Sequence, residues 1–215
     1  MPHRSTSRSR STSILAFAGL VLTCFLVGFS GCNSDTSKSV RAATPEAAFE
    51  QFCRATKAKN YQAMAALLTP DTLNDMASEM LGQATLLNKL SRMPVNTPET
   101  AKLKASAAKV MQLLKQYGLN QQLLDNIDPL AGDDGLTAAL DSITDKPGFV
   151  SSMMGLMDLH MPDAESPLPM IEESSIKGIE ISEQTATGTA TLDGYTCTWN
   201  FKQIDGSWCI DHPEF

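Results

Sequence analysis

Residues 185–211 read TATGTATLDGYTCTWNFKQIDGSWCID, and the architecture of the domain can be inferred from them first. Apolar and polar residues alternate along it, which is the period of a strand with one buried face. The dipeptides Asp193-Gly194 and Asp205-Gly206 are typical of two-residue hairpin turns. If both turns are tight, the paired residues are Ala186 with Phe201, Gly188 with Trp199, Ala190 with Cys197, Leu192 with Tyr195, and Phe201 with Ile210. Small residues thus lie opposite large ones, and the stretch predicts an antiparallel meander with one apolar face. The apolar residues Ile179 and Ile181 predict a further strand just before it.

Upstream of the meander, one local signal occurs three times. Thr-Pro followed by a carboxylate is found at 44–46, 69–71 and 97–99. Thr can cap free backbone amides, Pro fits the first helical position, and an acidic residue suits the positive end of the helix dipole. Each copy therefore predicts a helix start. The predicted helices cover about 45 to 58, 61 to 69, 70 to 91, 98 to 117, 119 to 126, 136 to 143 and 148 to 160, with Gly118 as a left-handed cap and Lys146-Pro147-Gly148 as a break.

Together these patterns predict an α+β fold. N-terminal helices and a long helical insert, at about 71 to 170, pack on a C-terminal antiparallel sheet. Residues 44–215 are expected to form a single domain, because this length suffices for one substantial core.

The N-terminus has the layout of an export signal. Arg4, Arg8 and Arg10 precede an apolar run without charges from Ile14 to Phe29. The run is shorter than the roughly 20 residues that a spanning helix needs, although a short retained anchor is an alternative. Residues 1–31 are thus predicted to be a signal peptide. The Ser-rich residues 32–43 have little to bury and are expected to form a flexible tether.

The segment Phe29-Ser30-Gly31-Cys32 resembles the lipobox of bacterial lipoproteins, with Phe29 where that family usually has Leu. The resemblance implies that the Cys32 thiol is acylated and becomes the new N-terminus. Several acyl chains would form an effectively permanent membrane anchor, since each buried methylene contributes about 0.8 kcal/mol. The resemblance to the lipobox also implies a lipid-anchored protein on the periplasmic or extracellular side of a bacterial envelope. An ordinary signal peptide followed by an unmodified cysteine is the alternative.

The charge balance argues against a nucleic-acid partner. The whole chain has 17 basic and 24 acidic residues, a net charge of -7. Loss of the three arginines in the signal would make the mature chain more acidic still. Contact with phosphates needs clustered Lys and Arg, and the basic residues here are scattered.

Both ends of the predicted domain resemble the NTF2-like (SnoaL-like, cystatin-like) family. The opening Thr44-Pro45-Glu46-Ala47-Ala48-Phe49, with residues 63–70, looks like the family's first two helices, and the segment 199–210 resembles its last hairpin. The insert at 71–170 departs from the pattern. The family includes isomerases, dehydratases, epoxide hydrolases and many non-catalytic binding modules, so the resemblance implies a fold more than an activity.

In the catalytic members, Asp, His or Tyr lies inside the cone between sheet and helices. The corresponding face here is mostly apolar, and the residues expected to line a pocket are Tyr61, Tyr195 and Trp199. We predict no catalytic residue and no cofactor. His212 is expected to be frayed and exposed near the chain end, and Asp158 and His160 are two positions apart on a helix, where side chains point in different directions.

Two other segments invite a metal-site interpretation, and we expect neither to hold a metal. Met153, Met157, His160 and Met161 share a helical face that could suit cuprous ion, but Met also fills irregular cores. Asp125, Asp128, Asp133 and Asp134 lack the spacing of an EF-hand and are expected to form a solvated loop.

Among the remaining cysteines, Cys53 could meet Cys197 across the core, but buried free thiols are the favoured interpretation for Cys53, Cys197 and Cys209.

The primary hypothesis is a non-catalytic, lipid-anchored module that binds an envelope protein or a small apolar ligand. The alternatives are a small enzyme with a pocket at Tyr61 and Tyr195, and a purely structural envelope protein. An open cavity with a strongly perturbed acid or base would favour the enzyme. A cone filled by Phe49, Trp199 and Phe201 would favour the module, and a large exposed apolar patch on residues 71–117 would favour the structural protein.

Overall fold

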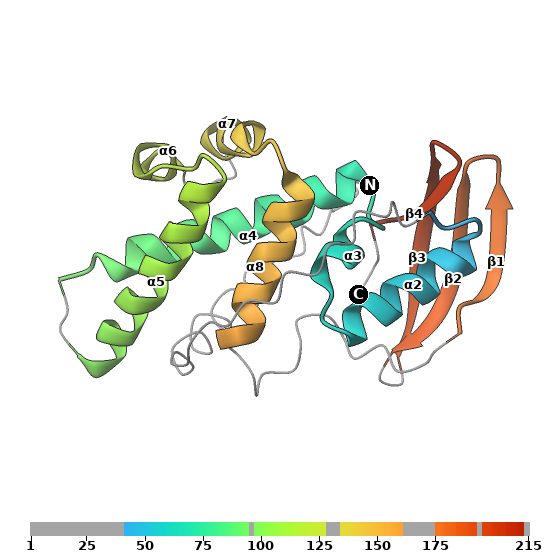
Figure 1. Ribbon diagram of the computed structural model, residues 1–215, viewed down its shortest axis with the longest axis horizontal. Coiled ribbons are helices and arrows are strands. Elements are labelled where there is room, and N and C mark those ends of the chain that lie inside the picture. The colour runs from blue at the N-terminus through green and yellow to red at the C-terminus, as the bar shows by residue number, and fades with distance from the viewer. Residues whose placement is uncertain (1–40, 95–96, 128–133, 161–174, 193–194, 213–215) are drawn as a thin grey trace, which may run out of the picture.

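The computed structural model describes residues 41–94, 97–127, 134–160, 175–192 and 195–212. Figure 1 shows an elongated molecule with a sheet at one end and a group of helices at the other. The fold is α+β, as predicted: the sheet is formed by the C-terminal strands, and the helices precede it in the chain.

The sheet is an antiparallel meander of β1 (Lys177–Ser182), β2 (Thr185–Leu192), β3 (Tyr195–Ile204) and β4 (Ser207–Asp211), in that spatial order. Every pair predicted between the last three strands is confirmed, including Gly188 opposite Trp199 and Phe201 opposite both Ala186 and Ile210. The β3–β4 turn is made by Asp205 and Gly206, which both have positive φ, 49° and 76°, as a type I′ turn requires. The Asp193-Gly194 turn lies outside the described residues.

The inner face of the sheet is covered by helix α2 (Pro45–Lys57), which lies across it in Figure 1. The helix begins at the N-cap Thr44, whose hydroxyl accepts a hydrogen bond from the amide of Ala47 at 3.2 Å. Residues at helical spacing on one side of α2 pack on the apolar positions of the strands. The buried residues of this layer are Ala48, Phe49, Phe52, Ala55, Ala186, Ala190, Trp199, Phe201, Trp208 and Ile210.

The first strand differs from the sequence-based expectation. The register between β1 and β2 shifts between Lys177 and Glu180, where Gly178 has a φ of 61°, so the strand has a bulge. Ile181 lies opposite the buried Ala186 on the inner face, but it is 59% exposed. It was expected to join the buried apolar set. It remains accessible because β1 is the outermost strand of the sheet.

The opposite edge of the sheet is covered by this chain. After the short helix α3 (Tyr61–Ala65), the segment Leu67–Thr69 runs parallel to β4. The amide of Ile210 donates to the carbonyl of Leu67 at 2.8 Å, and the amide of Thr69 donates to the carbonyl of Ile210 at 2.9 Å. Near the start of β4, the amide of Trp208 donates to the carbonyl of Ala42 at 2.9 Å. The first described residues of the chain are therefore attached to β4.

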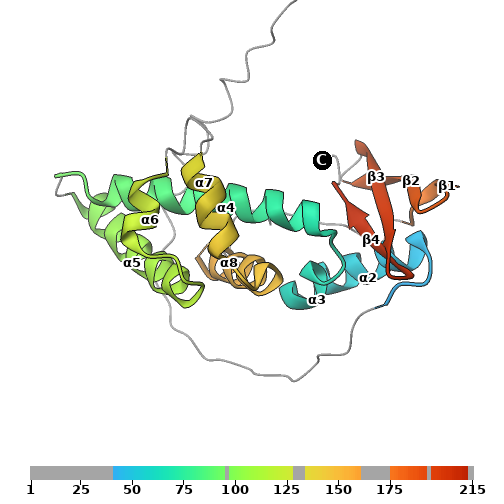
Figure 2. The same cartoon turned by 90° about the horizontal axis from the view of Figure 1, so that it is seen from above.

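The remaining helices form what we call the helical lobe: α4 (Pro70–Ser91), α5 (Pro98–Gln116), α6 (Gln121–Asp125), α7 (Asp134–Ser142) and α8 (Lys146–His160). Helix α4 extends from the sheet into the lobe, where α5, α7 and α8 pack against it, and α8 also contacts α3. Figure 2 shows α4 extending away from the sheet with the other lobe helices along it.

The predicted helix starts at 69–71 and 97–99 are confirmed. The hydroxyls of Thr69 and Thr97 accept hydrogen bonds from the amides three residues later, at 3.2 and 3.3 Å. Gly118 has a φ of 82° and follows α5 as the predicted left-handed cap. Helix α8 starts two residues earlier than expected, because Lys146 and Pro147 form its first turn and Asp145 accepts a hydrogen bond from the amide of Gly148 at 2.9 Å.

The apolar stripes of α4 and α5 face the interior of the lobe. Leu73, Leu81, Val110 and Leu114 are buried. Among the described residues, the large apolar side chains that are exposed are Met93 in the bend after α4, Leu159 in α8 and Ile181 in β1. The described part of residues 71–117 thus carries no large exposed apolar patch, the feature that would have favoured a purely structural protein.

None of the described helices is both long and apolar enough to cross a membrane. The apolar run 14–29 and residues 32–40 of the predicted tether, with Cys32, lie outside the described residues. The tether was predicted to reach residue 43, but Ala42 is completely buried and its carbonyl accepts from the amide of Trp208, so Ala42 belongs to the domain.

Candidate functional site

The space between α2 and the sheet, where a pocket was expected, is filled by aromatic side chains. Trp199 is completely buried. The ring of Phe49 meets it edge to face, with centroids 4.9 Å apart and planes at 84°, and the ring of Phe52 approaches it at 5.7 Å and 67°. Such edge-to-face contacts stabilise aromatic clusters beyond the burial of their area. Trp199 is therefore a core residue.

The sheet side of the same layer is equally close-packed. Gly188, opposite Trp199, has no side chain, and the space above it is taken by two isoleucines of the first strand region. A Cβ atom at Gly188 would lie 2.8 Å from Cδ1 of Ile176 and 3.0 Å from Cγ1 of Ile179. Even a methyl group would be crowded here, so this part of the interior has no room for a ligand.

Tyr61 lies at a different interface. It is the first residue of α3, and its ring faces α8 at Gly155, where a Cβ atom would be 4.0 Å from the ring. Burial raises the pKa of Tyr61 above its ordinary value, and the nearby carboxylate of Asp158 raises it further. A raised pKa makes the phenol a poorer acid at neutral pH, so its environment does not prepare it for acid/base chemistry.

Asp158 forms an ion pair with Lys59. Lys59 Nζ donates to Asp158 Oδ1 at 2.8 Å, and this bond raises the pKa of Lys59. The pair joins the loop between α2 and α3 to α8 at the surface. The side chain of His160 lies outside the described part of the chain, and so does that of Tyr195, whose backbone begins β3 opposite Leu192.

An open groove of about 430 Å³ runs between α2 and α3 on the outside of the molecule. Apolar and polar residues line it in nearly equal number: four alanines and Leu67 lie among Glu50, Gln51, Arg54 and Asn60. No histidine, cysteine or tyrosine lines it. The groove is open to solvent, so it offers a surface for contact with another molecule.

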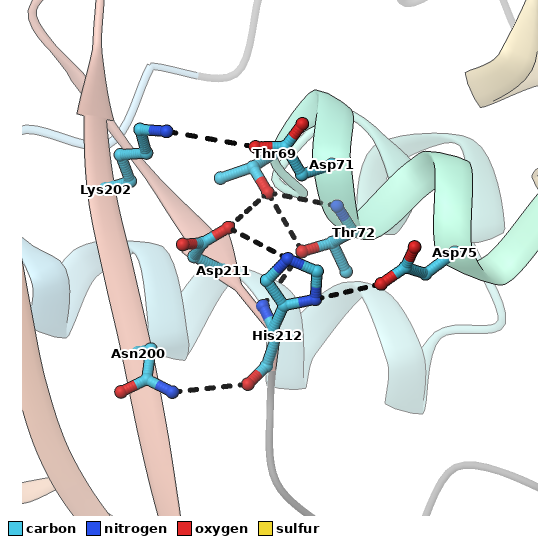
Figure 3. Close-up of polar contacts among 8 residues, drawn as sticks. All are labelled: Thr69, Asp71, Thr72, Asp75, Asn200, Lys202, Asp211 and His212. Carbon is cyan, nitrogen blue, oxygen red and sulfur yellow. Dashed lines mark hydrogen bonds and ion pairs between the residues drawn. The ribbon is translucent and has the colours of Figure 1, made fainter.

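The main polar cluster of the described residues joins the sheet to the helical lobe (Figure 3). We call Thr69, Thr72, Asp211 and His212 the α4–β4 junction. Thr69 is completely buried and Thr72 nearly so, whereas Asp211 is the last residue of β4 and His212 follows it. The Thr69 hydroxyl donates to Asp211 Oδ1 at 2.7 Å and lies 2.9 Å from the Thr72 hydroxyl. The amide of His212 donates to Thr72 Oγ1 at 2.9 Å.

The donor and the acceptor of each hydrogen bond in this cluster can be assigned from the chemistry of the groups. An ionised Asp211 carboxylate accepts hydrogen bonds only, so the Thr69 hydroxyl must use its proton on Asp211. The Thr72 hydroxyl then donates to Thr69 and accepts from the amide of His212. Every donor in this chain of bonds has an acceptor. Since the Thr69 hydroxyl is buried and bonded to a carboxylate, it is not placed as a nucleophile, and the cluster fixes α4 to the sheet.

His212 is exposed as predicted, with 49% of its side chain accessible, but the prediction that it is frayed was wrong. Its amide is bonded to Thr72, and its carbonyl accepts from the side chain of Asn200 at 3.3 Å. Its ring Nδ1 lies 3.2 Å from Asp75 of α4. The end of β4 is therefore held by α4, a contact between distant segments for which the local sequence holds no signal.

The two candidate metal segments are only partly described. Met153 and Met154 are buried in the helical lobe, while the side chain of His160 and all of Met161 lie outside the described residues. Asp125 accepts from Arg92 at 2.8 Å and from Gln121 at 3.0 Å, and the side chains of Asp128, Asp133 and Asp134 are not described. Within the described ranges, no three His, Cys, Asp or Glu side chains are placed to hold a metal ion.

The cysteines are free thiols in the described part of the chain: Cys53, Cys197 and Cys209 are all partly buried. Burial raises the pKa of Cys53 to about 12, and burial followed by the charge of Asp211 raises that of Cys209. Both shifts lower the thiolate fraction, so neither side chain is activated as a nucleophile.

Comparison with known protein families, with curated proteins and with solved structures found no match to this chain.

Proposed function

We propose that this protein is a lipoprotein of the bacterial envelope, anchored through Cys32, and that its domain is a non-catalytic NTF2-like module that binds a partner protein. The observation that carries the second part is the filled interior. Trp199, Phe49 and Phe201 occupy the space between α2 and the sheet, where catalytic members of that family hold a substrate. A filled interior leaves the outer surfaces of the domain for recognition.

The same packing favours a protein partner over a small apolar ligand. Ligand sites are concave, usually largely preformed, and typically enclose several hundred Å³. The groove beside α2 has a comparable volume of about 430 Å³, but it is open to solvent and would enclose little of a small ligand. Asp158 and Asp211 accept structural hydrogen bonds, and the pKa values of Tyr61, Cys53 and Cys209 are raised, so these side chains give no support to an enzyme.

The anchor is supported by the order of features along the sequence. The basic start, the apolar run ending at Phe29, the small residues before Cys32 and the Ser-rich stretch after it follow the layout of a lipoprotein signal. Ala42, close to the start of the described chain, is hydrogen-bonded to Ser207 and Trp208 of β4. A tether preceding it would therefore leave the domain at that edge of the sheet.

The anchor is tested by the intact mass of the protein extracted from membranes of a bacterial host, beside the Cys32→Ala variant. We expect a chain that starts at Cys32 and carries acyl groups, and we expect the variant to lack them. A wild-type chain that keeps residues 1–31 and carries no acyl mass would refute the anchor.

The filled interior is tested by titration with a fluorescent fatty acid. We expect no saturable binding to the native protein at micromolar concentration. Stoichiometric binding that is lost in a variant with a larger side chain at Gly188 would show an interior ligand site and would overturn the assignment of a module without one.

A further inference from the structure

The two edges of the sheet differ in whether other parts of the chain are hydrogen-bonded to them. The outer edge of β4 is paired with Leu67–Thr69 and with Ala42. Among the described residues, β1 has a neighbouring strand on one side only, which is β2. In Figure 1, β1 forms the far end of the molecule, away from the helical lobe. An open strand edge presents unpaired amides and carbonyls that can accept another strand.

The apolar face also continues to this open edge. One row of residues crosses the inner face, and its members are Ile181, Ala186, Phe201 and Ile210. The last three are at most 2% exposed, whereas Ile181 at the open edge is 59% exposed. A further strand beside β1 would extend the row and bury Ile181.

The sequence of this edge is complementary to itself. From 176 to 181 it reads IKGIEI, with Lys177 and Glu180 exposed on the outer face and isoleucines on the inner face. Two such strands, placed antiparallel, can pair Lys177 with Glu180 of the other copy and Ile176 with Ile181 of the other copy. Gly178 then lies opposite Ile179, a small residue facing a large one, as at Gly188 and Trp199.

We propose that β1 pairs antiparallel with β1 of a second copy of this chain, in this register, so that the two sheets become one continuous sheet. Opposite charges in directly paired positions stabilise antiparallel strands, and like charges destabilise them. Registers that place Glu180 opposite Glu180, or Lys177 opposite Lys177, are disfavoured for this reason. Charged side chains on an open edge normally prevent pairing with other strands. Here Lys177 and Glu180 instead favour one partner, a second β1, because only an antiparallel copy places the opposite charge beside each of them.

The arrangement is compatible with attachment of both copies to one membrane, because the chain enters each domain at β4, at the opposite edge of the sheet. It does not depend on the anchor, and a soluble form would pair in the same way.

Charge reversal tests the proposal. The full chain, purified in an excess of mild detergent, is compared with Lys177→Glu, with Glu180→Lys and with the double variant by sedimentation over a range of protein concentrations. We expect a wild-type dimer, a dimer dissociation constant raised by about tenfold or more in each single variant, and recovery in the double variant, where the ion pairs are exchanged. Because both side chains are exposed, circular dichroism should stay unchanged.

Mixing the two single variants gives the sharpest result. A Lys177→Glu copy beside a Glu180→Lys copy restores both ion pairs, so the mixture should form heterodimers although neither variant pairs well with itself. Lys115→Glu, an equal charge change on the exposed side of α5, serves as the control and should leave the dimer intact.

Two results would overturn the proposal. One is a monomeric wild type throughout the concentration range, which would mean that another strand or nothing covers β1. The other is a dimer that none of the charge reversals weakens, which is what a different interface or shared detergent micelles would produce.

Discussion

The hydroxyl of Thr69 donates a hydrogen bond of 2.7 Å to the carboxylate of Asp211, which joins the residue before α4 to the last residue of β4. These two residues lie 142 positions apart in the chain. Because α4 extends into the helical lobe and β4 belongs to the sheet, the bond lies where the two parts of the fold meet. The α4–β4 junction is thus a partly buried polar connection that also caps a helix.

Replacement of Thr69 with Val should destabilise the protein by about 1–3 kcal/mol, because it removes the helix cap and leaves Thr72 and Asp211 with one partner fewer. The measurement is urea unfolding followed by circular dichroism. Thr69→Ser keeps the hydroxyl and should lose much less. A Thr69→Val variant as stable as the wild type, beside a clear loss in Thr69→Ser, would show that the methyl group, and not the hydrogen bonds, stabilises this position.

The sequence predicted the elements whose signals are local. Thr97 caps a helix through an amide three residues away, and Asp205-Gly206 needs only its own backbone to form a turn. The partners of the α4–β4 junction were not predictable, since Thr69 has the same local context as Thr44 and nothing in that context indicates Asp211. The exposure of Ile181 was missed for a related reason: alternation shows which face a residue occupies but not how far the covering helix reaches. The sequence likewise predicted that Tyr61 and Trp199 line one pocket, whereas their assignment to separate interfaces depends on the packing of α8 and α2.

Gly188→Ala should destabilise the protein by about 1–3 kcal/mol, because the added methyl group would meet Ile176 and Ile179 at distances well below ordinary contact. Gly82→Ala is the matched control. Gly82 lies inside α4 with open space around its missing side chain, so the same substitution should stabilise the protein by up to about 1 kcal/mol. Both changes are read from urea unfolding midpoints. A neutral Gly188→Ala would mean that the isoleucines above it are loosely held.

Trp199→Ala should cost about 3–5 kcal/mol, because it opens a cavity between Phe49, Phe52 and the sheet. If the variant remains folded, that cavity should bind small aromatic molecules, and the melting temperature should rise when they are added. Trp199→Phe leaves a smaller space and should show both effects more weakly. A small loss of stability in Trp199→Ala would indicate that the interior already contains empty volume, which would favour a ligand-binding function.

Stability should fall in alkaline solution because of Cys53. Its folded-state pKa is about 12 against an ordinary value of 9.0, so between these values the unfolded chain loses the thiol proton while the folded chain keeps it. Since stability rises with pH only where the unfolded state binds more protons, it must decline here from about pH 9 upward, and the contribution is fully present below that pH. Cys53→Ala removes this titration and should flatten the alkaline decline measured by urea unfolding between pH 8 and pH 11, a window set by the two values above. Cys209→Ala is the comparison, because its thiol is less deeply buried and its pKa is raised less. An unchanged alkaline decline in Cys53→Ala would mean that Cys53 is accessible to solvent, and that α2 packs less closely on the sheet than its buried aromatic face indicates.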